Sequence, residues 1–588
     1  EDPDVLAVMR HSAAHVMAQA VLRLFPDAKY AIGPSIEDGF YYDFDLPRPL
    51  TEEDLAAIEK QMAAIADADQ PFLREEVTRE DAVRLFTEEL PQPYKVEILE
   101  GGDEEGQVKV GEVVTLYRND GAFTDLCLGP HVPSTSRIGH FKLLRFSGAY
   151  WRGDEGRPQL QRLYGTTWPT PEALEDHLHR LEEAERRDHR RLGRDLDLFS
   201  SPQELGAGLV LWHPKGGMVR KILEDFSRDI HIERGYEIVA TPHIGRSWLW
   251  ETSGHLEKFA EDMFPPIQAE EGDYYLKPMN CPFHVLIYRS RTRSYRDLPI
   301  RLSELGTVYR HERSGVLHGI FRPRGFTQDD SHIFCTPEQL VDEIKGVMDF
   351  TVDFYGAFGM KDAVVHLSTV DPEAAIGSSD MWRRAEETLR SALDSSPFTY
   401  DVKEGAGAFY GPKIDFDYRD ALGRLHQLTT IQCDFALPER FGLEYVGEDN
   451  SAHRPVMVHR ALYGSVERFF GVYLEHTAGA LPPWLAPVQA RVIPIKDDVI
   501  EGARGILAQL QSAGLRADLD DARETMQYKV RRGTLEKVPW MLVVGPKELE
   551  AGTVSIRTRG GADRRGVPLE DFVAEACEAV ASKAFDVD

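Results

Sequence analysis

The chain has 588 residues, 42% of them apolar, and a formal net charge of −30. At roughly 100–200 residues per domain, this length predicts three or four domains. A chain with this much negative charge has no general electrostatic attraction to nucleic acid or membrane. Any binding of nucleic acid would therefore depend on local basic patches. The five widely spaced cysteines form no disulfide framework and indicate a reducing compartment. No signal peptide opens the chain, and no apolar run predicts a membrane span.

The N-terminal region predicts a helix followed by strands. Apolar residues recur at helical spacing over residues 5–24, which places His11 and His15 one turn apart on one face. The glycine-punctuated segment 31–45 is typical of strands, and a second helix is expected over 52–66.

A second pair of metal-ligating residue types follows about a hundred residues later. Segment 124–131 reads TDLCLGPH and places Cys127 four residues before His131. Together with the HSAAH segment at 11–15, it is a plausible zinc set. HSAAH taken alone fits equally well a helix with two packed or solvated histidines.

A highly charged segment then divides the chain. Thr170 and Pro171 form an N-cap and first-turn pair, and the helix that they open has a narrow apolar stripe. Gly193 is expected to end it. We interpret residues 169–197 as a connecting helix.

The last hundred residues show an alternating pattern that indicates a small α/β domain. Strand, helix, strand, helix and strand are predicted, in that order, over residues 490–495, 498–513, 515–519, 524–534 and 540–544. Basic and acidic residues are nearly balanced there, which is compatible with a locally basic surface that faces RNA.

The central segment 307–335 reads TVYRHERSGVLHGIFRPRGFTQDDSHIFC. The planar guanidinium groups of Arg310 and Arg322 are suited to phosphates, and the nearby carboxylate of Glu312 can accept a hydrogen bond from an adenine amine. Surface ion pairing explains any one of these residues alone. The chain contains no GxxxxGK[ST] motif, so a nucleotide site here would be of another type.

Several segments together resemble class II aminoacyl-tRNA synthetases. Residues 307–335 and 464–476 resemble motifs 2 and 3 of that class, and residues 217–242 resemble motif 1. The segments KPMNCPFH, RGFTQDDSHIFC, GAFYGPKIDF and VMVHRALYGSVERF are similar to threonyl-tRNA synthetases. HSAAH and TDLCLGPH resemble the editing domain of that family. The likeness covers nearly the whole chain in the family's order, but the family's small ubiquitin-like first domain is absent, which fits a chain that begins at Glu1.

The resemblance implies an α+β multidomain fold. An N-terminal α+β editing domain, a linker helix, a class II catalytic domain with an antiparallel sheet and a C-terminal α/β anticodon-binding domain are expected over residues 1–168, 169–197, 198–487 and 488–588. The implied activity is ATP-dependent ligation of L-threonine to tRNA(Thr) through threonyl-adenylate, with hydrolytic editing of mischarged Ser-tRNA(Thr). The implied enzyme is a cytoplasmic homodimer with no membrane association.

The same resemblance implies roles for individual residues. One Zn²⁺ per chain is expected in the catalytic domain, with Cys281, His332 and His459 as ligands, and Mg²⁺ is expected with ATP. The catalytic residues would be Arg310, Lys413 and Arg468. The ATP-binding residues would be Arg310, Glu312, Arg322, Phe326, Gln427, Thr430 and Arg468. Threonine would be bound by Gln328, Asp330, Tyr410 and Gln432. Editing would use His11, His15, Tyr42, Lys95, Asp125, Cys127 and His131. The anticodon would be bound by Lys537, Glu548 and Arg557.

Substrate chemistry explains why two sites are expected. Three protein ligands leave zinc an open position, and a zinc that takes the amine and hydroxyl of threonine rejects valine, which an apolar pocket cannot do strongly. Serine offers both groups and lacks only a methyl, which is worth roughly 1–3 kcal/mol. A second, hydrolytic site is therefore required.

We expect that second site to work without a required metal. Its substrate is an activated ester, which needs only a positioned water and a base with a pKa of about 6–7, such as histidine. A tetrahedral zinc site formed by the two histidines of HSAAH with Cys127 and His131 is the alternative.

Three other functions stay open from the residues alone. A free-standing deacylase would not need the intact ATP-site residues. A non-catalytic tRNA-binding paralogue should have lost Arg310, Arg468 or a zinc ligand. A related class II enzyme could act on another amino acid. An ATP–pyrophosphate exchange assay across the amino acids distinguishes all of these.

Overall fold

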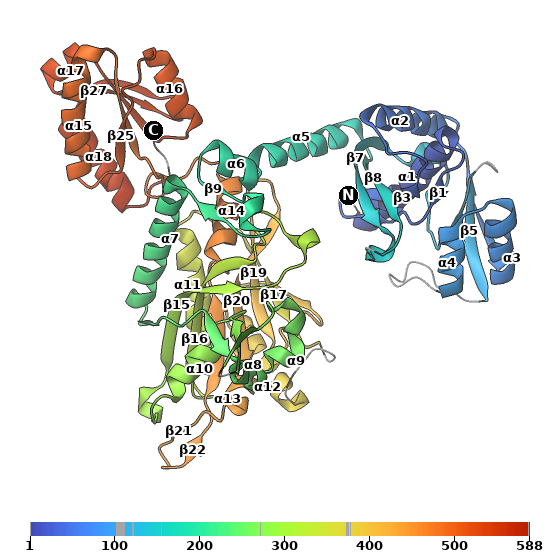
Figure 1. Cartoon of the computed structure of the whole chain (residues 1–588), viewed down its shortest axis with the longest axis horizontal. Helices are drawn as coiled ribbons and strands as arrows, with labels where there is room; N and C mark the ends of the chain where they lie inside the picture. Colours follow the sequence, from blue (N-terminus) through green and yellow to red (C-terminus); the bar gives the residue numbers. More distant parts are fainter. Residues whose placement is uncertain are drawn as a thin grey trace. The chain divides into compact units, whose positions relative to one another are not determined.

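The computed structural model describes residues 2–101, 112–119, 123–154, 156–270, 272–371, 376, 378–585 and 587. The chain forms two compact units, Glu1–Glu182 and Glu183–Asp588. Helix α5, Pro171–Arg187, leads from the first unit into the second (Figure 1). The four domain boundaries expected from the sequence stay predictions.

Helix α1, Pro3–Leu24, is the core helix of the first unit. Asp2 caps its start by accepting the N–H of Asp4 at 3.0 Å. Although the sequence alone predicts no membrane span, α1 is long and apolar enough to cross a membrane by length and composition, the only such helix among the described residues. Of its apolar window, 67% is buried, so packing inside the unit accounts for its composition.

Two antiparallel sheets surround α1 and the helices of the first unit. One has the order β1–β3–β8–β7, with β2 paired to β3, and the other has the order β4–β5–β6. The strands are β1 Lys29–Tyr30, β2 Ser35–Ile36, β3 Gly39–Asp45, β4 Phe72–Thr78, β5 Val113–Asn119, β6 Phe123–Leu126, β7 His140–Tyr150 and β8 Gln159–Trp168, and the further helices are α2 Glu52–Asp67, α3 Arg79–Arg84 and α4 Pro93–Gly101. The predicted helices and strands up to residue 67 are confirmed.

An eight-stranded sheet forms the centre of the second unit (Figure 1). Its strand order is β11–β15–β16–β23–β20–β19–β17–β18, and only the two edge pairs are parallel. The strands are β11 Glu237–Ile238, β15 Ile300–Tyr309, β16 Gly325–Cys335, β17 Ala363–Ser368, β18 Tyr400–Lys403, β19 Lys413–Arg419, β20 Leu425–Asp434 and β23 Val456–Ala461. This is the predominantly antiparallel sheet that the sequence predicts.

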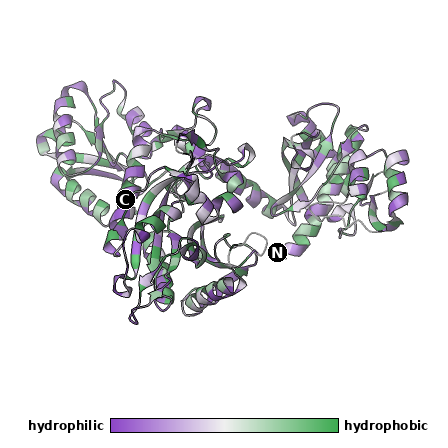
Figure 2. Ribbon diagram, turned by 60° about the horizontal axis from the view of Figure 1, so that its bottom comes forward, coloured by the Kyte–Doolittle hydropathy of each residue, from purple (hydrophilic) through white to green (hydrophobic). Residues whose placement is uncertain are grey.

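Long helices bury apolar faces against this sheet. They are α7 Pro214–Glu233, α11 Leu340–Gly356, α12 Ser379–Asp394 and α14 Val466–His476. Apolar and polar residues lie side by side along the helices in Figure 2, as expected where a helix buries one face.

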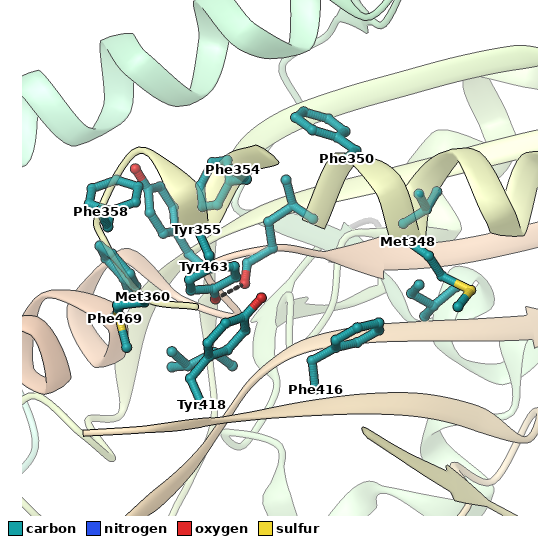
Figure 3. Close-up of a cluster of buried hydrophobic side chains, with 14 of the residues drawn as sticks. Met348, Phe350, Phe354, Tyr355, Phe358, Met360, Phe416, Tyr418, Tyr463 and Phe469 are labelled. Atoms are coloured by element: carbon teal, nitrogen blue, oxygen red, sulfur yellow. Dashed lines mark hydrogen bonds between the residues drawn. The ribbon is translucent and has the colours of Figure 1, made fainter. Parts of the chain in front are cut away.

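Aromatic rings fill the core between α11, the sheet and α14 (Figure 3). Tyr355 stacks on Tyr418 with ring centroids 3.8 Å apart. The Tyr355 hydroxyl donates to the carbonyl of Leu462 at 2.5 Å, at the turn between β23 and α14. Tyr463 and Phe469 pack beside it, also with almost no exposure. This core therefore fixes the start of α14, which carries one of the predicted catalytic arginines.

The connecting helix differs from the prediction at its end. Thr170 caps α5 as expected, but the chain breaks at Asp188 and begins a second helix, α6, over His189–Asp195. Gly193 lies inside α6 and does not end it. A Cβ at Gly193 would be 2.5 Å from Cζ of Phe199, so glycine is needed there for close packing and not for a helix end.

The C-terminal region contains a five-stranded sheet in the order β25–β24–β26–β27–β28. Its elements are β24 Ala490–Pro494, α15 Ile500–Ser512, β25 Ala517–Leu519, α16 Met526–Leu535, β26 Trp540–Val544, α17 Pro546–Ala551, β27 Thr553–Thr558, β28 Asp563–Pro568 and α18 Leu569–Ala581. The five predicted elements are confirmed, with small shifts of their ends. The last two strands and the helices α17 and α18 are additions.

Two candidate active sites and a candidate RNA-binding surface

A cleft of about 350 Å³ opens on the central sheet. Gln328, Asp330 and His332 alternate along β16 and therefore face the cleft from one side of that strand. The predicted residues that line the cleft are Cys281, Arg310, Gln328, Asp330, His332, Tyr410, Lys413, Gln427, Thr430, Gln432 and His459. All predicted zinc and threonine ligands thus meet in one place.

Cys281, His332 and His459 form a candidate metal centre. One potential ligating atom of each lies within 4.8 Å of the others, and all three side chains are buried. His332 and His459 are directly opposite each other on β16 and β23, and Cys281 is the first residue of α10, Cys281–Arg289. Burial raises the pKa of the Cys281 thiol well above its usual value. One sulfur and two imidazole nitrogens are a donor set that suits Zn²⁺.

Hydrogen bonds leave one nitrogen of each histidine free for a cation. Nε2 of His459 donates to Oδ2 of Asp434 at 2.8 Å, which leaves Nδ1 as an acceptor. Nδ1 of His332 is 2.7 Å from Nδ1 of His284, whose Nε2 is 3.2 Å from a Glu304 oxygen. Because an ionised carboxylate only accepts, His284 donates to Glu304 and accepts from His332. Nε2 of His332 and Nδ1 of His459, 3.1 Å apart, keep their lone pairs. The residues therefore fit a zinc ion.

A buried carboxylate lies beside these ligands. Oδ1 of Asp330 is 3.6 Å from Nε2 of His332, and Oδ2 accepts from the amide of Asn280 at 3.0 Å. Burial raises the pKa of Asp330. Tyr410 donates to Gln432 on the opposite side of the cleft. The arrangement presents a hydrogen-bond acceptor to a small polar molecule bound at the metal position.

Of the three arginines predicted to bind ATP, Arg310 lines this cleft. The guanidinium of Arg310 is within 5.5 Å of two ring centroids, those of Phe259 and Phe326. Burial lowers the pKa of Arg310, against the effect of nearby carboxylates. The predicted residues Glu312, Arg322, Phe326 and Arg468 adjoin the cleft and do not line it. Arg322 donates to Glu312 at 2.9 Å.

Asp415, which was not predicted from the sequence, is a further candidate residue of this site. One of its oxygens is 3.0 Å from Nζ of Lys413, and the other accepts from Gln427 at 2.6 Å and from Thr430 at 2.8 Å. It therefore joins a predicted catalytic residue to two predicted ATP ligands. Its position two residues after Lys413 on β19, on the same strand face, was a usable signal. The carbonyl of Gln427 in turn accepts from Arg468 at 3.1 Å.

A second cleft, of about 360 Å³, lies in the first unit. Nε2 of His11 is 2.9 Å from Sγ of Cys127, and the same sulfur is 3.4 Å from Nε2 of His131. Asp125 pairs with Lys95 at 2.6 Å and with His15 at 3.3 Å. It also accepts from the hydroxyl of Tyr42 at 2.5 Å. All seven predicted editing residues are thus brought together.

Burial makes the histidines of this cleft weaker bases than free imidazole. It lowers the pKa of His11, lowers that of His15 well below the usual value and lowers that of His131 to about 2. It raises the pKa of the Cys127 thiol to about 12. All four groups are therefore neutral at physiological pH, which differs from the base of ordinary pKa expected from the sequence.

The same four side chains also satisfy the spacing of a metal site. Potential ligating atoms of His11, His15, Cys127 and His131 lie within 4.8 Å of one another. Nδ1 of His131 is 3.0 Å from the hydroxyl of Ser12, which orients Nε2 toward the cleft. The geometry accommodates either a cation or a water, and a count of bound zinc distinguishes them.

The three predicted anticodon residues do not lie together. Glu548 in α17 accepts from the hydroxyl of Ser555 at 3.3 Å, and Arg557 lies two residues farther along β27 on the same face. Lys537 lies three residues before β26, whose second residue, Met541, pairs with Arg557, whereas Glu548 follows the other end of that strand. It lines a separate groove of about 750 Å³, together with Arg186, Arg191, Tyr528, Arg531 and Arg532.

Three family models match the chain. Residues 263–477 match the tRNA synthetase class II core domain (G, H, P, S and T), residues 489–578 an anticodon binding domain, and residues 114–164 the threonyl and alanyl tRNA synthetase second additional domain. With the central, predominantly antiparallel sheet and the cleft on it, these matches define a class II aminoacyl-tRNA synthetase.

Similar proteins of known name show which synthetase family within this class the chain belongs to. The threonine–tRNA ligase of Magnetococcus marinus is 51% identical over 99% of this chain and 89% of its own length, and that of Acidobacterium capsulatum is 52% identical over 100% and 86%. The chain belongs to the threonine–tRNA ligase family. Among solved structures, the RNA binding domain of threonyl-tRNA synthetase from Cryptosporidium parvum Iowa II is 40% identical, with a TM-score of 0.64, over 68% of this chain and 98% of its own. The resemblance and the fold class predicted from the sequence are confirmed.

Proposed function

We propose that the chain ligates L-threonine to tRNA(Thr) in the cleft of the central sheet and hydrolyses Ser-tRNA(Thr) in the cleft of the first unit. The observation that carries this proposal is the central cleft itself. Within about 350 Å³, it combines a candidate zinc centre, a buried carboxylate and an arginine held between aromatic rings. Membership of the threonine–tRNA ligase family supports the reaction.

Threonine would be recognised through its hydroxyl. Cys281, His332 and His459 would hold Zn²⁺, which supplies a Lewis acid with an open coordination position. Asp330 accepts a hydrogen bond from the substrate hydroxyl, while Asn280 fixes its carboxylate from the other side. Valine leaves this buried acceptor unpaired, and a site built to hydrogen-bond a hydroxyl rejects the analogue that lacks one by about 10⁴-fold or more.

ATP would bind beside Arg310 in the same cleft, together with Mg²⁺. Among the described residues, the guanidinium of Arg310 donates only to the carbonyl of Pro278, at 3.3 Å, so its remaining N–H groups can bind the α-phosphate. Arg322 and Arg468 face the outer phosphates, and Glu312 and Phe326 hold the adenine. Attack of the threonine carboxylate on the α-phosphorus is then promoted by position and by stabilisation of developing charge.

Editing would depend on neutral side chains that hold a water. Asp125 orients His15 and Lys95 by direct pairing. The neutral imidazoles of His11 and His131 accept hydrogen bonds from the attacking water and hold it in position against the ester. Lys95 donates to the oxyanion that forms on the ester carbonyl and stabilises it.

We extend the proposal to a cytoplasmic homodimer. Exposed isoleucines occur in the motif 1 region and just after it, with exposed fractions of 57% for Ile232, 43% for Ile238 and 41% for Ile244. A second copy of the chain would cover them. All five cysteines are free, which supports a reducing compartment.

The test is zinc content and amino-acid activation in Cys281→Ser. We expect bound zinc to fall from one per chain toward zero and threonine-dependent ATP–pyrophosphate exchange to be lost, because zinc then has only two protein ligands. Cys577→Ser, in the C-terminal sheet domain, should keep both. Full exchange activity with threonine but not valine in a protein without zinc would disprove the assignment.

A further inference from the structure

A buried histidine outside both clefts joins three elements of the second unit. His189 is the first residue of α6 and has no exposed surface. Its Nδ1 is 2.7 Å from a carboxylate oxygen of Glu475, near the end of α14. Its Nε2 is 3.2 Å from the backbone nitrogen of Ile320, and the ring of Phe321 stacks on the imidazole with centroids 4.1 Å apart.

These contacts fix the protons of the imidazole and exclude a metal role. A backbone N–H can only donate, so Nε2 accepts from Ile320 and Nδ1 carries the hydrogen that is donated to Glu475. Asp188, His189 and Glu475 have the spacing of a metal site. However, both nitrogens of His189 are engaged, so it has no lone pair for a cation.

Glu475 is a rigid anchor for this histidine. It accepts the backbone N–H of His189 at 2.9 Å as well as the ring N–H. Its other oxygen is 2.6 Å from Arg424, which also pairs with the buried Asp420. Because Arg424 immediately precedes β20, the imidazole is tied both to α14 and to the strand that carries two of the proposed ATP ligands.

The segment held by the imidazole is the loop between β15 and β16. Ile320 lies two residues before Arg322, which pairs with Glu312. Gly319 approaches the imidazole so closely that a Cβ would be 2.1 Å from Nε2 of His189. Its φ of +50° also favours glycine. The backbone of this loop is therefore fitted against the imidazole.

We propose that His189 is a positioning residue for ATP: it holds the loop at Ile320 and Phe321 so that Arg322 faces the nucleotide phosphates. The inference rests on the proposed role of Arg322 in ATP binding and goes beyond it, because His189 itself touches no substrate. It predicts that a change at His189 affects ATP binding more than threonine binding.

The experiment measures ATP–pyrophosphate exchange in the full chain. His189→Ala should raise the KM for ATP about tenfold, as expected for a lost buried hydrogen-bond pair, with the KM for threonine unchanged. His189→Gln, whose amide oxygen can accept from Ile320, should restore much of the loss. His189→Phe keeps the stacking on Phe321 but offers no hydrogen-bond acceptor, so it should not restore the loss. A double variant with Arg322→Ala should lose less than the sum of the two single effects.

The controls distinguish this inference from helix damage and from an error in the proposed ATP site. Asp188→Ala removes the cap of α6 but no loop contact, and its KM for ATP should stay at the wild-type value. An increase equal to that of His189→Ala would overturn the inference, as would additive losses in the double variant or a glutamine variant as impaired as alanine. If Arg322→Ala alone leaves the KM for ATP unchanged, the proposed ATP assignment fails. In that case, a raised KM for ATP in His189→Ala would show that His189 does not act through Arg322.

Discussion

The Nδ1 atoms of two buried histidines lie 2.7 Å apart, one histidine being His284 of α10 and the other His332 of β16 in the central sheet. Glu304 lies on the far side of His284 and is itself held by the N–H of Thr241 at 3.0 Å and by its hydroxyl at 2.7 Å. Burial opposes ionisation of Glu304, but His284 and other nearby donors outweigh it and lower its pKa. A chain of hydrogen bonds thus runs from an ionised carboxylate to the candidate metal centre.

This relationship predicts that His284 controls zinc affinity without binding zinc. His284→Ala should weaken zinc binding about 10- to 100-fold, the usual effect of losing a group that orients a metal-bound histidine. Competition with a chelator at fixed pH measures the change directly. His366→Ala removes another largely buried histidine, on β17, and should leave zinc affinity unchanged. Equal zinc affinity in His284→Ala and the unchanged protein would contradict the prediction.

The family resemblance explains which site residues the sequence could predict. Gln328, Asp330, His332 and Cys281 were assigned because their segments resemble threonyl-tRNA synthetases, and no metal-ligand spacing along the chain selects them. Asp415 was missed although it follows Lys413 by two residues, since its other partners, Gln427 and Thr430, lie on another strand. His284 was missed because its partner meets it only across the fold. No spacing along the chain encodes the approach of α10 to β16.

The fold also contains some features that the sequence predicts and others that it does not. Thr170 at the start of α5 was predictable, because capping depends on neighbouring residues. The position of Gly193 was not, because its role is set by the ring of Phe199 packed against it. The separation of Lys537 from Glu548 likewise follows from β26, which lies between them along the chain and whose conformation spacing alone does not give.

We predict that the cleft of the first unit edits without a metal. His11→Ala combined with His15→Ala should leave threonine charging and zinc content unchanged and should let Ser-tRNA(Thr) accumulate, because both residues line only this cleft. His140→Ala, on an exposed position of β7, is the matched control and should affect none of the three quantities. Two zinc ions per chain, one of them lost in the double variant, would establish a second metal site.

The rate of editing should depend little on pH between about 5.5 and 8. A free imidazole with a pKa of about 6.5 is some 90% protonated at pH 5.5 and would lose about tenfold in rate. Burial lowers the pKa of His131 to about 2, so this imidazole stays neutral throughout that range, and it shifts the pKa values of His11 and His15 in the same direction. Single-turnover deacylation of Ser-tRNA(Thr) measures this. A tenfold fall centred near pH 6.5 would show that a base of unshifted pKa limits the rate.

The last prediction concerns the face of β27 that carries Ser555 and Arg557. Arg557 is 37% exposed in its side chain, and its pairing with Asp563 is long, at 3.5 Å. Its guanidinium is therefore available to a nucleotide, and Glu548, held by Ser555, can accept from a base on the same face. Arg557→Ala should lower kcat/KM for tRNA charging by about 1–3 kcal/mol in free energy, as for an arginine that reads a base. ATP–pyrophosphate exchange should not change, because that reaction needs no tRNA.

Anticodon variants of the tRNA separate reading of the anticodon from general RNA affinity. Arg557→Ala should charge a wild-type transcript and one with a substituted anticodon at similar rates. Lys537→Ala should still charge the wild-type transcript faster, because Lys537 lines a groove that does not include Arg557. Arg564→Ala removes a neighbouring arginine that is paired with Glu575 and is the control for surface charge. Deleting residues 488–588 should reduce charging far more than exchange. If Arg557→Ala reduces exchange as much as charging, the face of β27 acts through the catalytic domain and does not read the anticodon.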